Sequence, residues 1–535
     1  MTNRLVRLLF TQQVMRAAAA ALVVLVAWHW LIPLAEFRPS PQILRLALPG
    51  SVGTLDPALS SQPAEATVGR QIAEPLLGPR ADVKDVQPLA ADHWHVSADG
   101  LTYTFHLRPS RYSDGTMVRA QDFVFEWRRL VDPRVGSRWS GLFTSSLAGA
   151  SALTALDPGS DSGAIDEALS KVGLAAPDNA TFVVTLSHPQ ASFKWMATLW
   201  AGVPVTPQGL TSQTFNGPYR VGGRVGGGEL ILVPSPTYSG RAKAALSRIE
   251  MRLGVTASAG FSLYQEGLVD MVGLAVAQGP SGALHRTPLP TLYWINFNTR
   301  QPPFDNPNVR RAFALAVDRT DLTAQVAPGA GLFPRGQLDG VAISIPAQPF
   351  DPNRARSALA GAQVDPAILA RVQLMVRSDS PGSQEVADLL SAGWRTTLGL
   401  DVVKDSVDSA TLVRRLGTGD FQIQVLGGWQ GDYPDQQELD DQFLSTSPLD
   451  YSGFKSAQFD DLVTRADASS DPTARSSLYQ QATSVLADGT PVVALYQQVQ
   501  WSQIKPYVSG VLLTPFDGSG FPGSVFAATI HIQPH

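Results

Sequence analysis

The chain of 535 residues contains no cysteine. This absence excludes disulfide bonds, cysteine nucleophiles and thiolate metal sites, together with the lipid-modified cysteine that tethers many exported proteins to a membrane. Histidine is also scarce, with eight residues, of which His93 and His95 form the only close pair. Both face the same side of a predicted strand, but a zinc site needs two further ligands. We therefore expect ordinary strand-surface residues there, no metal site and no cofactor.

A strongly basic region is missing as well. With 41 basic and 46 acidic residues the formal net charge is only −5. No basic block stands out, so nucleic acid is not an expected partner. Hydrophobic residues make up 44% of the chain, which is ordinary for a globular protein. A chain of this length exceeds one hydrophobic core, so we expect two or three lobes.

The common catalytic motifs are absent too. The chain has no Gly-x-Ser-x-Gly nucleophile elbow, no zinc-binding His-Glu-x-x-His helix and no phosphate-binding P-loop. Gly518, Gly520 and Gly523 match the dinucleotide pattern formally, but Pro522 interrupts it and too little chain follows for a βαβ unit. We interpret this stretch as a loop, and we expect no catalytic residue and no enzymatic activity.

Residues 1–36 have the pattern of a targeting segment. Arg4, Arg7 and Arg16 precede an apolar run over residues 17–35 that holds no acidic residue. The run is long for a signal-peptide core and slightly short for a membrane span, and Pro33 makes a poor cleavage site. A cleaved signal peptide and an uncleaved N-terminal membrane anchor therefore both remain open. In either case the basic end stays in the cytoplasm and the rest of the chain is exported.

The run over residues 97–133 predicts the order strand, turn, strand, turn and helix. Over residues 101–107 apolar residues alternate with polar ones, which is the period of a half-buried strand. A Ser-Asp-Gly turn follows at 113–115, and residues 121–130 then change to helical spacing with Trp127 on the apolar face. These features alone indicate an α+β surface unit.

A later region shows alternating strand and helix patterns. They follow one another as strand 372–376, helix 384–398, strand 402–403, helix 410–416 and strand 421–426. Strands separated by helices of this length indicate a mostly parallel α/β sheet. The end of the chain is again rich in strand patterns, at 492–500 and 508–513.

Six blocks of this sequence match sequence motifs of a known protein family, and they occur in the same order. They are Thr54-Leu55-Asp56-Pro57, the run 97–133, Asn216-Gly217-Pro218-Tyr219, the motifs within 296–319, Phe350-Asp351-Pro352-Asn353-Arg354-Ala355, and Gly428-Trp429-Gln430-Gly431-Asp432-Tyr433-Pro434-Asp435. On these blocks the chain resembles the extracytoplasmic solute-binding proteins of family 5, the peptide/nickel-binding family of ABC importers, and its oligopeptide-binding type in particular.

The resemblance implies an α/β fold of two lobes, the type II periplasmic binding protein. Such a protein closes as a hinged clamp around its ligand, and an extra domain packs on the first lobe. The implied division is a first lobe from 41–63, 188–290 and 496–535, an extra domain over 64–187, and a second lobe over 291–495. The chain crosses between the lobes near 290 and 495, so we expect the hinge there.

For a peptide ligand, the resemblance implies that Asp432 binds the charged ammonium. A buried ammonium needs a carboxylate at short range, because an unpaired buried charge costs several kcal/mol. The alternative is that Asp432 only shapes a turn before Tyr-Pro. Asp435 has a different pattern: with Glu438 three residues later it forms a capping box, and we assign Asp435 to structure.

Five further ligand-binding residues are implied by the resemblance. Gly427 and Gly428 end a buried strand and allow the main chain of a ligand to pair with its edge; Trp429 would cover that pairing, and Trp139 and Tyr496 would face the ligand. Core packing is the alternative for all three aromatic residues. The chain departs from its family at Leu426 and Gly427, where peptide binders carry a basic residue for a peptide carboxylate.

The function implied is the solute-binding subunit of an ABC importer, which captures peptides and delivers them to the transmembrane permease subunits. We expect a periplasmic monomer, either free or anchored to the inner membrane by residues 1–36. Two alternatives remain open. One is a binding protein of the same family for a non-peptide solute, such as a metal chelate, a glycoside or haem, and the other is a membrane-anchored sensor built on the same clamp.

Overall fold

The computed structural model describes residues 42–225, 228–241, 243–328, 330, 344–345, 347–523 and 527–535. The signal peptide or anchor predicted over residues 1–36 lies outside these described residues. Within them, no helix combines the length and the apolar content that a membrane crossing requires.

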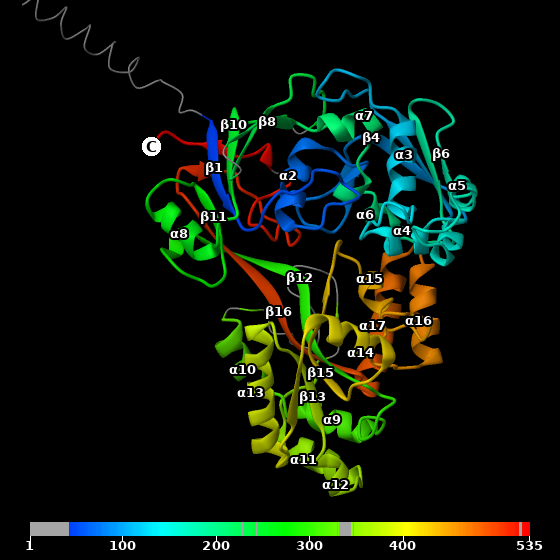
Figure 1. The fold of residues 1–535 in the computed structure, drawn as a ribbon, viewed down its shortest axis with the longest axis vertical. Coiled ribbons are helices and arrows are strands. Elements are labelled where there is room, and N and C mark those ends of the chain that lie inside the picture. The colour runs from blue at the N-terminus through cyan, green and yellow to red at the C-terminus, as the bar shows by residue number, and fades with distance from the viewer. Residues whose placement is uncertain are drawn as a thin grey trace, which may run out of the picture.

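One long, twisted sheet runs through the molecule (Figure 1). Among the described residues it has ten strands, in the spatial order β14 (Val403–Val407), β13 (Gln373–Arg377), β15 (Ile423–Gln430), β12 (Leu284–Phe297), β16 (Val492–Ile504), β11 (Met271–Leu274), β1 (Ile43–Leu48), β10 (Arg248–Leu253), β9 (Glu229–Pro234) and β8 (Tyr219–Val225). The two longest, β12 and β16, pair antiparallel and cross from the upper part of the molecule to the lower part. Their pairing shifts register between Pro288 and Leu292, midway along the crossing.

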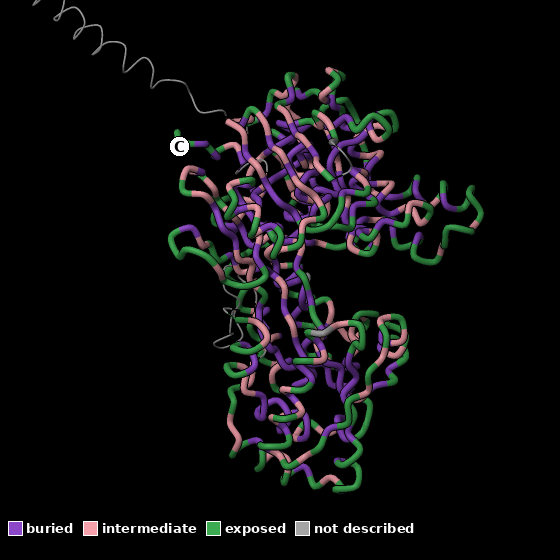
Figure 2. The backbone as a smooth tube through the Cα atoms, turned by 60° about the vertical axis from the view of Figure 1, so that its left-hand side comes forward, coloured by how far each residue is buried: buried purple, intermediate pink, exposed green. Residues whose placement is uncertain are grey.

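Two lobes therefore share this sheet. Figure 2 shows buried residues running through an upper and a lower body that meet at a narrower waist. The observed two-lobed α/β architecture agrees with the one predicted from the sequence.

The upper lobe packs helices α2 (Pro63–Ile72) and α8 (Ala257–Gln265) and the short strands β17 (Val508–Ser509) and β18 (His531–Ile532) around β1 and its neighbours. The motif at Asn216 and Gly217 joins the end of α2 to β8. The Asn216 side chain accepts a hydrogen bond from the backbone N–H of Glu74 (2.9 Å) and donates one to its carbonyl (3.1 Å). A Cβ at Gly217 would lie 2.3 Å from the carbonyl carbon of Ile72, so only glycine fits.

The strand predicted over 508–513 is wrong beyond its first two residues. Strand β17 ends at Ser509, and Gly510 follows with a φ of +74°, a left-handed conformation that ends an extended strand. The chain then packs against α2, where Arg70 donates a hydrogen bond to the carbonyl of Phe516 (2.8 Å).

A separate four-stranded sheet, β4-β5-β7-β6, extends the upper lobe. The elements of this part are β2 (Leu77–Pro79), β3 (Val86–Pro88), β4 (Ala91–Val96), β5 (Thr102–Leu107), β6 (Leu174–Ala175), β7 (Thr181–Thr185), α3 (Ala120–Val131), α4 (Ser140–Ser146), α5 (Ser162–Ser170) and α6 (Phe193–Met196). Helix α7 (Pro207–Ser212) follows them and packs on the core around β1. The predicted strand 101–107 and helix 121–130 are confirmed as β5 and α3. Trp127 is fully buried, packs edge-on against Phe143 and Phe182, and donates its indole N–H to the carbonyl of Gly202.

The lower lobe contains the parallel part of the main sheet. Strand β13 pairs in parallel with both β14 and β15, which confirms the parallel α/β prediction. The helices of this lobe are α9 (Pro307–Leu315), α10 (Arg319–Val326), α11 (Pro352–Gly361), α12 (Pro366–Leu369), α13 (Pro381–Leu398), α14 (Ser409–Thr418), α15 (Gln436–Asp440), α16 (Ala457–Asp467) and α17 (Pro472–Gly489). Trp394 on α13 is buried, and its indole N–H donates to the carbonyl of Phe313 (3.0 Å).

Candidate ligand-binding site

A cavity of about 520 Å³ lies where the two lobes meet. Its walls come from α2, the loop before α4, the segment around α6 and residues 514–519 on the upper side, and from residues 430–434 on the lower side. Residues 289–291 of β12 and Gln498 of β16 line it at the crossing. A cavity of this size and composition suits a small organic ligand, and movement of one lobe against the other would change its width.

Asp432 lies in this cavity, directly after strand β15. Its side chain is 29% exposed, and its Oδ1 lies 3.5 Å from an Nη2 of Arg138 on the opposite lobe. Burial raises the pKa of the Asp432 carboxyl to about 6, although the positive charge of Arg138 acts to lower it. The lower lobe thus presents a carboxylate to the space between the lobes.

Arg138 is a functional candidate that the sequence reasoning missed. It precedes helix α4, is 48% exposed and lines the cavity. Its guanidinium carbon lies 4.0 Å from the centroid of the Trp139 ring, so the cation rests on the aromatic face. The signal that could have found it is its position directly before Trp139, an aromatic residue already expected to face the ligand.

The edge of β15 is the second feature of the site. On one side, Gly427 and Gly428 pair with Trp294 and Tyr293 of β12. On the other side, the pairing with β13 stops at Gln424, and within the described residues no strand continues it. Within the described residues, the main chain after Gln424 therefore has no partner strand on this side, so an extended ligand could be added there. Of the rest of β15, Gln430 lines the cavity.

Local packing explains both glycines independently of any ligand. A Cβ at Gly427 would lie 2.5 Å from the side-chain amide nitrogen (Nδ2) of Asn296, and one at Gly428 would lie 2.8 Å from the backbone carbonyl oxygen of Leu292. The preceding residue, Leu426, has a φ of +49°, and the pairing with β12 shifts register opposite it. Leu426, where the sequence departs from the resemblance by lacking a basic residue, therefore lies in a β-bulge, and this bulge bends the end of β15.

The six residues predicted to bind the ligand are only partly brought together. Asp432 and Trp139 line the cavity, whereas Gly427, Gly428, Trp429 and Tyr496 do not. Trp429 is 5% exposed and packs in the core of the lower lobe. Tyr496 is also buried, with its ring centroid 5.1 Å from that of Tyr293. The role of these six residues in ligand binding stays a prediction.

Asp435 is part of the structural support beneath the site. Its carboxylate accepts a hydrogen bond from the backbone N–H of Gln437 (3.0 Å) and so caps α15, which confirms its predicted structural role. The same oxygen lies 2.5 Å from an Nη2 of Arg475 on α17. Burial raises the pKa of Asp435, and the charge of Arg475 opposes this effect. The predicted capping box also requires a contact from the Glu438 side chain back to Asp435, but the side chain of Glu438 is not among those that the structure describes.

The lower lobe also touches the upper lobe away from the crossing strands. Tyr433 is 2% exposed and belongs to the same hydrophobic cluster as Trp127 and Phe193 of the upper lobe. Ser192 donates a hydrogen bond to the side-chain oxygen of Gln437 on α15 (2.5 Å). Figure 1 shows α15 directly below α4 and α6, to one side of β12 and β16. We call residues 432–437 the docking segment.

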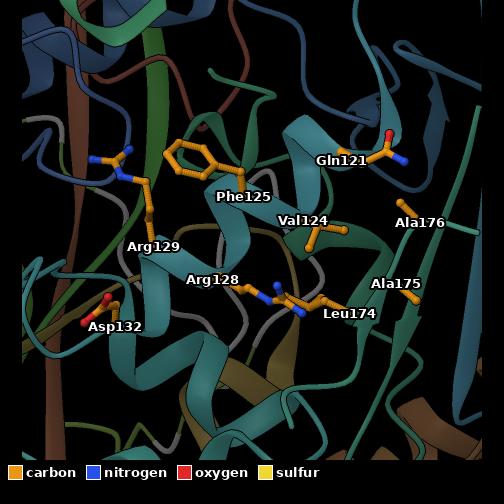
Figure 3. Close-up of a pocket in the computed structure, with 9 residues that line it drawn as sticks. All are labelled: Gln121, Val124, Phe125, Arg128, Arg129, Asp132, Leu174, Ala175 and Ala176. Atoms are coloured by element: carbon orange, nitrogen blue, oxygen red, sulfur yellow. The ribbon is translucent and has the colours of Figure 1, made fainter. Parts of the chain in front are cut away.

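A second hollow lies on the outer face of the upper lobe, between α3 and β6 (Figure 3). Among its charged residues, Arg129 pairs with Asp56 and with Glu126, each at 2.5 Å. None of the predicted ligand-binding residues lies there. The cavity at Asp432 is therefore the stronger candidate.

Two lobes that share two crossing strands and enclose a cavity between them define a hinged ligand-binding protein of the periplasmic type. Residues 85–450 match the family described as bacterial extracellular solute-binding proteins, family 5, and the chain belongs to this family. It is therefore a solute-binding protein and not an enzyme.

Known proteins of similar sequence cover nearly the whole chain. A probable deoxycholate-binding periplasmic protein of Escherichia coli, YgiS, is 27% identical over 92% of this chain and 94% of its own length. The periplasmic oligopeptide-binding protein OppA of Escherichia coli is also 27% identical, over 95% of this chain and 96% of its own. Among solved structures, the periplasmic murein tripeptide binding protein MppA in its unliganded open form superimposes with a TM-score of 0.79 at 24% identity, covering 93% of this chain and 98% of that one. This last likeness shows the shared fold.

Proposed function

We propose that this protein is the solute-binding subunit of an ABC importer and that it captures peptides between its lobes for delivery to the transmembrane permease. The observation that carries the proposal is the placement of the Asp432 carboxylate in the cavity between the lobes, just after β15, whose edge beyond Gln424 is paired by no described strand. An extended peptide could place its ammonium at Asp432 and its main chain along β15. Main-chain pairing gives affinity that does not depend on side chains.

The relatives support this assignment. OppA of Escherichia coli is named an oligopeptide-binding protein and shares almost the full length of this chain. The name of YgiS points instead to a bile acid, a non-peptide solute. Both are named as periplasmic, which supports an exported, periplasmic location here, and we propose a monomer that is free or held to the inner membrane by residues 1–36.

The proposed domain division is also part of this hypothesis. It consists of a first lobe from 41–63, 188–290 and 496–535, an extra domain over 64–187 and a second lobe over 291–495. The buried cluster around Trp127 supports the extra domain, whereas the buried residues of α2 pack with β1 in a different cluster. This packing favours a boundary after Ile72 rather than at 64.

Native mass spectrometry of the full chain, purified from a bacterial periplasm, tests the proposal. We expect co-purifying peptide masses that a mild denaturing wash removes, and a higher melting temperature when the peptides are added back. A protein that arrives without peptides, and that a mixed peptide pool does not stabilise, would contradict peptide capture. Stabilisation by a bile acid alone would then favour the non-peptide alternative.

Peptide binding should weaken as the pH falls through about 6. Only the charged form of Asp432 attracts an ammonium, and burial raises the pKa of this carboxyl to about 6. One unit below that pKa about nine-tenths of the carboxyl is protonated, so we expect affinity about ten-fold lower than at neutral pH, with protons released on binding. Calorimetry in buffers of different ionisation enthalpy measures both effects. An affinity that stays constant across this range would contradict the assignment of Asp432.

A further inference from the structure

Arg138 and Asp432 face each other across the boundary between the lobes. Arg138 precedes α4 of the upper lobe, Asp432 follows β15 of the lower lobe, and both line the cavity. Their charged groups are 3.5 Å apart, and both are partly exposed. The carboxylate at which a peptide ammonium should bind is therefore already within ion-pair distance of a cation of the protein itself.

The position of the guanidinium does not depend on Asp432 alone. It also lies 4.0 Å from the centroid of the Trp139 ring, and Trp139 is 7% exposed and fixed in the core of the upper lobe. Stacking on an aromatic face keeps a cation in place after its counter-ion has been taken by another group. Arg138 is therefore a second charged group that stays at the wall of the cavity once a ligand has reached Asp432.

We infer that Arg138 determines specificity at this site: the ligand ammonium replaces its guanidinium at Asp432, and the guanidinium then binds an anionic group of the ligand beside that ammonium. This inference rests on the proposed peptide function. The chemistry is a paired exchange of counter-ions, in which one ion pair within the protein becomes two ion pairs with the ligand. A ligand that supplies only the ammonium leaves Arg138 without its carboxylate partner.

The class of ligand that satisfies both groups is a peptide with a free ammonium and an acidic first residue. The carboxylate of an N-terminal aspartate lies a short side chain away from its own ammonium, which is comparable with the separation of Arg138 and Asp432. Arg138 supplies the cation for that carboxylate from the upper lobe.

Calorimetry on the full chain tests the inference with alanine peptides, from dipeptide to pentapeptide, and with the same peptides carrying aspartate in the first position. We expect the wild-type protein to prefer the aspartate peptides, and Arg138→Gln to reduce that preference about ten-fold. Arg138→Gln should also bind the alanine peptides several-fold more tightly, because its side chain no longer competes for Asp432. Arg138→Lys should retain part of the preference.

Arg134→Gln is the matched control, since Arg134 is exposed, pairs with Asp132 and Asp166, and does not line the cavity. It should leave both affinities unchanged. Peptide binding with the same preference in wild type and in Arg138→Gln would overturn the inference while leaving the proposed function intact. Failure of every peptide to bind the wild-type protein would overturn the proposed function, and the inference with it.

Discussion

Replacing Asp432 with asparagine is expected to reduce the affinity for a peptide with a free N-terminus by roughly thirty-fold or more. An ammonium that enters the cavity loses part of its water, and the carboxylate of Asp432 provides the compensating charge there. Removing one member of such a charge pair costs about 2–5 kcal/mol, which corresponds to at least about thirty-fold in the dissociation constant. The side chain is only 29% exposed, so solvent screening weakens the effect less than it would at an open surface.

Titration calorimetry with each peptide and its N-acetylated form measures this loss. The acetylated peptide carries no ammonium, so its weaker binding should be the same in wild type and in Asp432→Asn. Asp166→Asn is a suitable control, because this carboxylate is 66% exposed and lies in an ion pair away from the cavity. Equal affinity of wild type and Asp432→Asn for the free peptide would show that the ammonium is bound elsewhere.

Replacing Arg475 with methionine is expected to destabilise the protein by about 3–5 kcal/mol. The guanidinium of Arg475 and the carboxylate of Asp435 are 14% and 6% exposed, and they lie 2.5 Å apart. Removing the cation leaves a buried carboxylate without its charge partner at the N-terminus of α15. Denaturant unfolding measures the loss in the free energy of unfolding.

The double variant Arg475→Met, Asp435→Asn separates the charge effect from lost packing. With both charges removed, much of the stability should return, since a buried pair adds little compared with a neutral replacement. A single variant as stable as the wild type would contradict the structural role of the pair. A double variant no more stable than Arg475→Met would assign the loss to packing instead.

The sequence predicted the fold where local patterns and tertiary packing agree. The alternation over 101–107 and the helical spacing after it became β5 and α3, because the apolar face of each is the face that packs around Trp127. The strand pattern over 508–513 lacked such support. Gly510 turns the chain there, and its left-handed conformation cannot be inferred from apolar spacing alone.

The site was harder to predict for a physical reason. Asp432 and Trp139 were both named from the family resemblance, and they line one cavity. Arg138 was missed because its proposed role depends on its contact with Asp432, almost 300 residues away in the sequence. No local sequence pattern indicates such a contact. Trp429 and Tyr496 are buried and do not line the cavity, and their role in ligand binding stays a prediction. An aromatic residue in a strand has the same sequence pattern whether it faces a ligand or a core.

The docking segment has a consequence for the time course of solute exchange. Strands β12 and β16 connect the two lobes, so the lobes can rotate against each other about an axis through these strands. A contact away from this axis limits how far they rotate. Tyr433 is buried in the hydrophobic cluster of the upper lobe. It shortly precedes α15, which lies below α6 in Figure 1. A wide swing must withdraw this ring from its apolar surroundings, which costs roughly 1.5–3 kcal/mol. We therefore expect the rate of solute exchange to depend on the burial of this aromatic ring, in addition to the charges that bind the solute.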